Sequence, residues 1–249
     1  MIRVFIAIGL VVLFLIVGLP ACGILFLLKK KDPVGAAEKA QALAAGVLKG
    51  ITGLIGIRYE TRGLENVPKE GGLLFASNHR SYYDIVAAYC TVNRQVGFIA
   101  KNGLWKALSL RRWMQLVNCY FLNRDDIRQG LEVIKSATER VKNGGCVWVC
   151  PEGTRNKSED NTSLLEFHEA SFKIAERGGV QIVPVAFYGT RERWECQFPK
   201  MLPGKITVIY GKPFYVKDLG PEWKKKTGAY TAERVREMLL EEKARRENS

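Results

Sequence analysis

The sequence predicts an α/β protein with a mixed sheet flanked by helices and an N-terminal membrane-inserting helical segment. From about Ile55 onward, short runs rich in valine, isoleucine and aromatic residues alternate with amphipathic stretches, which is typical of a sheet covered by helices. Residues 4–28 carry no charge. The chain has 249 residues, of which 47% are hydrophobic, so it can form one globular domain and an anchor.

The uncharged N-terminal stretch is long enough to enter a membrane. As one helix, residues 4–28 would extend about 38 Å, against about 30 Å of bilayer hydrocarbon. Pro20 interrupts the stretch, so we expect a kinked span or a shallow insertion in one leaflet. The lysines at 29–31 follow, whereas only Arg3 and the N-terminal amine precede, and this bias places the rest of the chain in the cytosol. A cleaved signal peptide is the less favoured alternative, because the apolar run continues past Cys22.

A second helix is expected over residues 33–54, which are alanine-rich with Lys39 and Lys49 as their basic residues. It would lie on the membrane beside the first helix. We therefore divide the chain into membrane-anchoring helices over residues 1–54 and an α/β domain over residues 55–249. The expected location is the cytoplasmic membrane, with the α/β domain on the cytosolic side.

The α/β domain contains seven expected strands, several of them apolar throughout as buried strands are. They are residues 57–61, 72–77, 96–100, 117–122, 146–150, 181–187 and 206–210. Helices are expected over residues 82–91, 104–115, 128–142, 169–177 and 231–245. The third helix should stop at Gly144 and Gly145, and the charged residues from 241 onward are expected to fray.

The net charge and the cysteine content restrict which binding partners and metal sites we expect. The formal charge of +13 favours anionic partners. Beside an apolar terminus, the phospholipid bilayer is the best of them, and we expect no nucleic acid because no aromatic RNA-binding motif is present. The six cysteines show neither a CxxC pair nor zinc-like spacing to the two histidines, so we expect reduced thiols and no metal.

One of the two histidines, His79, stands five residues before Asp84. Histidine can take a proton near neutral pH, and a nearby carboxylate can orient its ring. Within one helix, residues five apart point about 140° away from each other. For the two side chains to meet, His79 must lie in the turn before a helix and Asp84 in the first helical turn. The alternative is a capping box, with Ser81 as the N-cap and Asp84 three residues later.

A second polar motif, Pro151-Glu152-Gly153-Thr154-Arg155, follows the expected strand at residues 146–150. A glycine between a carboxylate and an arginine allows a tight turn that aims both side chains at one ligand. The planar guanidinium suits a phosphate, and Glu152 could hold the arginine or accept from a substrate hydroxyl. Ligands commonly bind at strand ends in α/β sheets. The alternative is an ordinary turn with a surface ion pair.

Together these motifs resemble the glycerolipid acyltransferase family, in particular bacterial 1-acyl-glycerol-3-phosphate acyltransferases. That family carries an N-H-x4-D block, an arginine ending a strand, a P-E-G-T-R block and a V-P block. The resemblance covers about residues 55–214. In this chain the four motifs occur in the same order, at residues 78–84, at Arg124, at residues 151–155 and at residues 183–185.

The resemblance implies roles for individual residues. His79 would be the general base and Asp84 the residue that orients it. Lys101 would lie near the thioester carbonyl. Arg124 and the block Glu152-Gly153-Thr154-Arg155 would bind the glycerol phosphate of the acceptor. The residues assigned to substrate binding are Lys101, Arg124, Glu152, Gly153, Thr154 and Arg155.

The chain departs from the family pattern in two places. Where the family usually reads F-K-x-G, this chain has Phe167-His168-Glu169-Ala170, and we expect His168 on the surface. Residues 118–124 contain asparagine and leucine where the family more often has glycine, isoleucine and aspartate. These departures do not change the reaction type that the resemblance implies. They leave open which acceptor the protein uses.

The predicted function is transfer of a fatty acyl chain from an acyl thioester to the free hydroxyl of lysophosphatidate, giving phosphatidate. Acyl-CoA or acyl carrier protein would be the co-substrate, with no other cofactor. No G-x-S-x-G nucleophile motif is present, so direct transfer is preferred over an acyl-enzyme. The alternatives are an acyltransferase acting on another lysolipid, a thioester hydrolase, and a basic membrane-anchored adaptor without catalytic activity.

Overall fold

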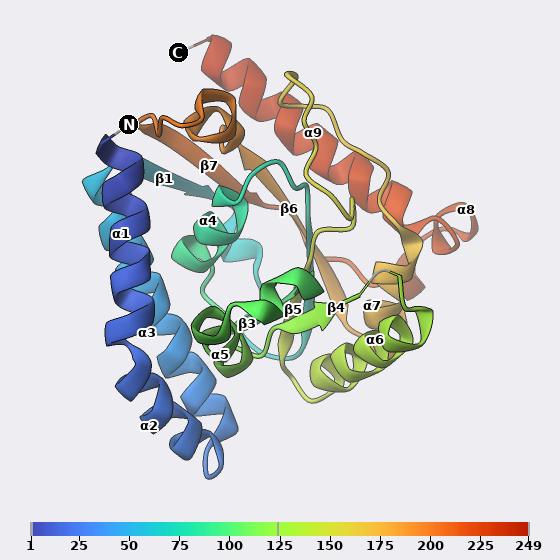
Figure 1. The fold of residues 1–249 in the computed structure, drawn as a ribbon. Helices are drawn as coiled ribbons and strands as arrows, with labels where there is room; N and C mark the ends of the chain where they lie inside the picture. Colours follow the sequence, from blue (N-terminus) through green and yellow to red (C-terminus); the bar gives the residue numbers. More distant parts are fainter. Residues whose placement is uncertain (1, 124, 249) are drawn as a thin grey trace.

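The computed structural model describes residues 2–123 and 125–248. The strands in this part of the chain form one seven-stranded mixed sheet in the order β1-β7-β6-β2-β5-β3-β4 (Figure 1). The predicted mixed sheet is therefore confirmed. The strands are β1 (Ile57–Arg62), β2 (Leu73–Ser77), β3 (Val96–Lys101), β4 (Tyr120–Leu122), β5 (Cys146–Val149), β6 (Gln181–Tyr188) and β7 (Gly204–Tyr210).

Strand direction places the carboxyl ends of five strands at one edge. β2 pairs in parallel with β5 and with β6, and β3 pairs in parallel with β5 and with β4. β7 is antiparallel to β6, and β1 runs parallel to β7. The carboxyl ends of β2 to β6 therefore share an edge, where ligands commonly bind in α/β proteins.

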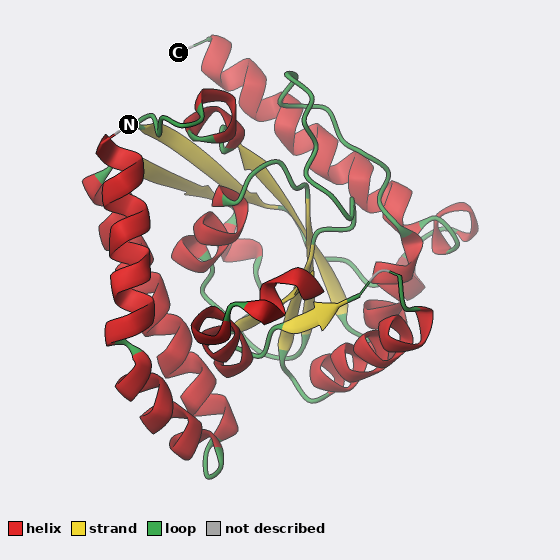
Figure 2. Cartoon of the chain, viewed as in Figure 1, coloured by secondary structure: helices red, strands yellow, loops and turns green. Residues whose placement is uncertain are grey.

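Helices cover both faces of the sheet (Figure 2). Alternate residues of β2 face opposite ways. Phe75 packs into a cluster with residues of α3 (Pro33–Leu54) and α4 (Tyr83–Thr91), whereas Leu74 packs into a cluster with residues of α6 (Ile127–Lys142), α7 (Lys173–Gly178) and α9 (Thr227–Glu247). This two-residue period is that of a strand buried on both sides. The α-helices of the α/β domain are α4 (Tyr83–Thr91), α5 (Leu108–Leu116), α6 (Ile127–Lys142), α7 (Lys173–Gly178), α8 (Pro221–Lys224) and α9 (Thr227–Glu247).

In the described part of the chain, three helices precede the sheet: α1 (Ile2–Val17), α2 (Leu19–Lys29) and α3 (Pro33–Leu54). α1 and α2 are bent by 52° at Gly18. Pro20 lacks an N–H and its ring clashes with the carbonyl four residues earlier, which accounts for the break. Among the described residues, no helix by itself has the length and apolar composition of a membrane span, although the bent pair passes that test as a unit.

The N-terminal helices are fixed to the α/β domain by polar as well as apolar contacts. The Lys29 ammonium donates to the carbonyl oxygen of Gln115 at 2.6 Å and to Oδ1 of Asn118 at 2.8 Å. Lys29 therefore stabilises the C-terminal end of α5. Lys30 and Lys31 are exposed.

Several element boundaries differ from the sequence-based expectation. β4 is shorter, because Asn118 adopts φ +62° and so interrupts an extended strand. The helices expected at 104–115 and 169–177 each begin with a separate 3₁₀ turn, Asn102–Lys106 and Glu169–Phe172. The expected fraying from residue 241 is wrong, because α9 continues to Glu247. Glu242 is buried there and pairs with Arg62 and Arg246.

Candidate active site

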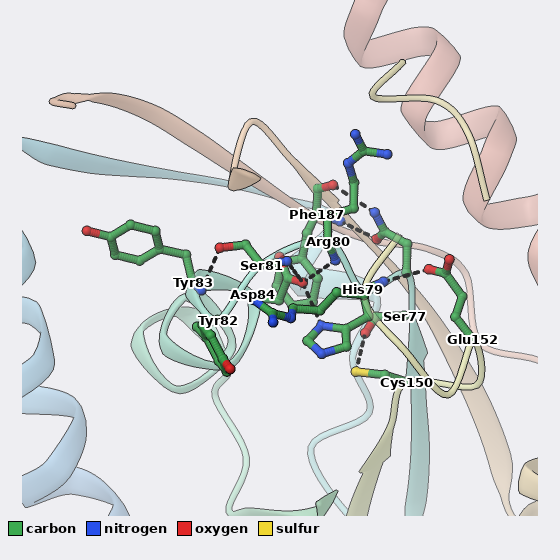
Figure 3. Close-up of polar contacts among 12 residues, drawn as sticks. Ser77, His79, Arg80, Ser81, Tyr82, Tyr83, Asp84, Cys150, Glu152 and Phe187 are labelled. Atoms are coloured by element: carbon green, nitrogen blue, oxygen red, sulfur yellow. Dashed lines mark hydrogen bonds and ion pairs between the residues drawn. The ribbon is translucent and has the colours of Figure 1, made fainter. Parts of the chain in front are cut away.

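The site begins where β2 leaves the sheet. Asn78 is fully buried, and its side chain pairs with the backbone of Phe187 on β6. Figure 3 shows the residues that follow, from His79 to Asp84. Asn78 Nδ2 donates to the Phe187 carbonyl at 3.0 Å, and the Phe187 N–H donates to Asn78 Oδ1 at 2.8 Å. The side-chain amide of Asn78 thus takes the place of a backbone hydrogen-bond pair between β2 and β6. This contact sets the direction in which the chain leaves the sheet toward His79.

The predicted contact between the imidazole and the carboxylate is present. His79 Nδ1 lies 2.8 Å from Asp84 Oδ2. The backbone N–H groups of Arg80 and Ser81 donate to the same oxygen, at 2.6 and 2.8 Å. Because this oxygen is the acceptor in both bonds, we assign Nδ1 of the histidine as a donor too. The ring's lone pair is then on Nε2, which can act as a base.

The capping box considered as an alternative forms only in part, because the N-cap of α4 is Tyr82 and not Ser81. Ser81 Oγ accepts the N–H of Tyr83 at 2.9 Å, while Asp84 reaches back to the Ser81 N–H. These are the reciprocal bonds of a capping box, shifted by one residue for the serine. One buried carboxylate therefore starts α4 and orients the histidine, so the two interpretations are compatible.

Glu152 supports the backbone of His79. Its side chain is buried, Oε1 accepts the His79 N–H at 2.6 Å, and Oε2 accepts the Leu165 N–H at 2.9 Å. Burial raises the pKa of Glu152 to about 7, although both hydrogen bonds favour the carboxylate. The Asn156 N–H donates to the His79 carbonyl at 2.7 Å. Glu152 therefore positions the histidine, and it does not hold Arg155 as the sequence suggested.

The glycine-bearing turn has the expected tight geometry. Gly153 adopts φ +69°, and its N–H donates to the Cys150 carbonyl at 3.0 Å. A residue with a Cβ is strained at this φ, so glycine suits the position. Thr154 is exposed. The turn projects Arg155 toward the beginning of α4.

Arg155 has different partners from those expected. Its guanidinium lies over the ring of Tyr82, 4.0 Å from the ring centroid, and Nη1 donates to Glu195 Oε1 at 3.2 Å. Tyr82 is 55% exposed, and its ring also packs against Trp194, with ring centroids 5.7 Å apart. Glu195 lies on the segment after β6, and no sequence motif indicated that it would belong to the site.

The other predicted substrate-binding residues lie further along the same edge. Lys101 is the exposed last residue of β3. β3 lies about two strand spacings, or 10 Å, from β2, the strand that leads into His79. Arg124 lies outside the described residues. A hollow of about 490 Å³, lined in part by Trp105 and Phe121, opens beside the ends of β3 and β4. His79, Lys101 and Arg155 are not among the residues that line this hollow.

Other predicted features of the chain have simple outcomes. His168 is exposed, as expected. The six cysteines all lie in the described part of the chain and are not joined in disulfides. Within residues 2–123 and 125–248, no group of three or more histidine, cysteine, aspartate or glutamate side chains is arranged to hold a metal ion.

Comparison with known proteins identifies the family of this chain. A family model described as Acyltransferase matches residues 58–188, more than half of the chain. The chain belongs to the acyltransferase family. Both the His79–Asp84 pair and the turn at residues 151–155 fall within the matched part of this acyltransferase.

Curated relatives match the acyltransferase over part of their length. A chloroplastic 1-acyl-sn-glycerol-3-phosphate acyltransferase of Brassica napus is 32% identical over 158 residues, which cover 63% of this chain and 45% of the relative. A protein of the same name from Saccharomyces cerevisiae is 30% identical over 195 residues, 76% of this chain and 60% of the relative. The chain thus spans about half the length of the curated relatives that it matches.

One solved structure is similar along nearly the whole chain. It is the crystal structure of the 1-acyl-sn-glycerophosphate (LPA) acyltransferase from Thermotoga maritima, with a TM-score of 0.77 and 23% sequence identity. The match covers 96% of this chain and 95% of that chain. At this identity the likeness establishes the fold of the acyltransferase, including the presence of N-terminal helices.

Proposed function

We propose that this acyltransferase moves a fatty acyl chain from an acyl thioester to the free hydroxyl of lysophosphatidate, giving phosphatidate. The observation that carries the proposal is the 2.8 Å contact between His79 Nδ1 and Asp84 Oδ2. The contact lies at the sheet edge toward which Arg155 also projects. Support comes from relatives that bear the name 1-acyl-sn-glycerol-3-phosphate acyltransferase.

The chemistry follows from the protonation state of the histidine. Nε2 of His79 takes the proton of the acceptor hydroxyl, and the hydroxyl oxygen attacks the thioester carbonyl carbon. Lys101 is our candidate for stabilising the negative charge that develops on the carbonyl oxygen. The carbon–sulfur bond then breaks, and the imidazolium returns its proton to the leaving thiolate of coenzyme A or acyl carrier protein. Asp84 keeps the ring oriented and stabilises the imidazolium.

The acceptor's phosphate would bind to the glycine-bearing turn. The Arg155 side chain is 31% exposed and stacks on Tyr82, so its donors are held in a defined orientation at the surface of the site. A planar guanidinium binds phosphate oxygens through paired hydrogen bonds. Arg124 is the second proposed phosphate ligand, from the resemblance alone.

The membrane is the proposed partner of the N-terminal helices. α1 and α2 expose Phe5 at 71%, Ile16 at 60%, Ile24 at 66% and Leu27 at 65%. Their 16 and 11 residues correspond to lengths of about 24 and 17 Å, so each helix is shorter than the roughly 30 Å bilayer core. We propose insertion into the cytoplasmic membrane, with the α/β domain on the cytosolic side and the exposed Lys30 and Lys31 at anionic head groups.

The decisive experiment is an acylation assay on the purified full chain. Two donors are compared, coenzyme A and acyl carrier protein, each carrying a labelled acyl chain as a thioester. Each donor is offered with lysophosphatidate, another lysophospholipid or a monoacylglycerol, and the products are identified. We expect phosphatidate, and we expect His79→Ala to lower turnover by about 10² to 10⁴ without loss of folding. Equal turnover by the variant would refute the assignment of the base. Thioester loss without any acceptor would indicate a hydrolase, and products from other acceptors alone would indicate another lysolipid.

A further inference from the structure

Glu195 occupies a cradle of three donors at the beginning of α4. It lies on a 3₁₀ turn, Glu195–Gln197, in the segment that follows β6. Its Oε2 accepts the hydroxyl of Ser81 at 2.7 Å, and its Oε1 accepts the N–H of Tyr82 at 2.9 Å. The guanidinium of Arg155 donates to the same Oε1 at 3.2 Å. A carboxylate is thus bound by a hydroxyl, a backbone amide at a helix start and an arginine.

These three donors are of the kinds that bind phosphate. Backbone N–H groups at a helix N-terminus, hydroxyls and arginine each form strong bonds to phosphate oxygens. The Glu195 side chain is 19% exposed and the Arg155 side chain 31%, so the ion pair is open to solvent on one side. A dissolved or lipid-borne anion can therefore reach the arginine.

The cradle lies beside the proposed base. Ser81, whose hydroxyl binds Glu195, also donates its N–H to the Asp84 oxygen that contacts His79. A phosphate bound here would be separated from the imidazole by a single turn of chain. In lysophosphatidate, the reacting hydroxyl and the phosphate are on neighbouring carbons of one glycerol, so this placement suits that acceptor.

We propose that Glu195 is an internal competitor for the acceptor's phosphate and thereby a specificity-determining residue. The inference rests on the proposed function, because it takes a phosphate monoester as the ligand. The carboxylate holds Arg155 while the site is empty. A phosphate monoester carries a charge of about −1.5 to −2 at pH 7, so it repels Glu195 and takes its place on the guanidinium. Binding of a phosphorylated acceptor is weakened by this exchange, whereas binding of an uncharged acceptor is not.

The test measures binding directly, so that it does not depend on turnover. Labelled lysophosphatidate or labelled monoacylglycerol in detergent micelles is titrated onto the full chain and onto Glu195→Gln, which keeps a side-chain oxygen acceptor but loses the charge. We expect the variant to bind lysophosphatidate about two- to fivefold more tightly, the range of one exposed ion pair. Binding of monoacylglycerol should not change.

Three controls separate competition from a purely structural role. Glu192→Gln removes a charge from the same segment at a residue that accepts from the Asn161 side chain instead, and it should bind as wild type does. Glu195→Asp keeps the charge and should show no gain. In an Arg155→Ala background the gain from Glu195→Gln should vanish, since the two effects act through one pair. If the glutamine variant does not fold, Glu195→Ala takes its place.

The outcomes for the two proposals can be told apart. Unchanged or weaker lysophosphatidate binding by folded Glu195→Gln would overturn the inference, and Glu195 would then be a support for Ser81 and Tyr82. Acyl transfer to lysophosphatidate with that binding result would leave the proposed function intact. Tighter binding without any acyl transfer would overturn the proposed function alone, and a protein that binds no lysophosphatidate would overturn both.

Discussion

His79 and Asp84 meet through a single oxygen that also stabilises the beginning of a helix. Asp84 Oδ2 lies 2.8 Å from His79 Nδ1 and accepts the backbone N–H groups of Arg80 and Ser81. The orientation of the proposed base therefore depends on the same bonds as the start of α4. A substitution at Asp84 should affect both activity and folding.

Asp84→Asn should lower kcat by about 10² or more, because the imidazolium loses its stabilising charge. It should also lower stability by about 1–3 kcal/mol, since an amide supports the three donors less well than a carboxylate. Steady-state kinetics and thermal unfolding check these two effects. The double variant with His79→Ala should be no slower than His79→Ala alone, because the two residues act as a unit. A much slower double variant would contradict this.

Arg155→Ala should raise KM for lysophosphatidate roughly tenfold or more, the effect of one hydrogen bond to a charged group, with kcat little changed. KM for a monoacylglycerol should not change, because that acceptor has no phosphate. Arg177→Ala, at an exposed residue in the last turn of α7, is the matched control. Equal increases of KM for both acceptors would argue against a phosphate-binding role.

Glu152 should make stability depend on pH. Burial raises its pKa from 4.5 to about 7, so between these values the folded state holds a proton that the unfolded state has released. The contribution of Glu152 to the free energy of unfolding is then largest below about pH 4.5 and falls as the pH rises toward 7. At 1.36 kcal/mol per pKa unit, the total decrease is about 3 kcal/mol.

Denaturant unfolding of the full chain at a series of pH values checks this prediction. Glu152→Gln cannot titrate, so its unfolding free energy should lack that contribution to the slope. Glu166→Gln, at an exposed glutamate of the same region, should keep the wild-type slope. Identical pH dependence in wild type and Glu152→Gln would show that Glu152 does not titrate in this range.

The exposed apolar side chains of α1 and α2 should bind the full chain to phospholipid vesicles. Replacing Phe5 and Ile24 together by aspartate should strongly reduce co-sedimentation with vesicles that contain anionic lipid, because charges are disfavoured in hydrocarbon. Ile127 begins α6 and is 79% exposed, so Ile127→Asp is a control that should leave co-sedimentation unchanged. Undiminished binding by the double variant would remove the support for N-terminal insertion.

Much of the fold could be predicted from local patterns. α3 has the bounds expected from its composition, and most strands lie within one or two residues of their predicted positions. The exceptions have long-range causes. β4 is short because Asn118 takes a left-handed conformation and receives a bond from Lys29, 89 residues away. The end of α9 is ordered because Glu242 meets Arg62 of β1.

The sequence by itself predicted the contact between His79 and Asp84, because residues five apart can meet where a turn leads into the first turn of a helix. It also determined the tight turn at Gly153. Only the tertiary structure decided what surrounds them. Glu195 reaches Ser81 across 114 residues, and Glu152 reaches the backbone of His79 because β5 pairs with β2. Such contacts depend on strand order, which local periodicity does not encode.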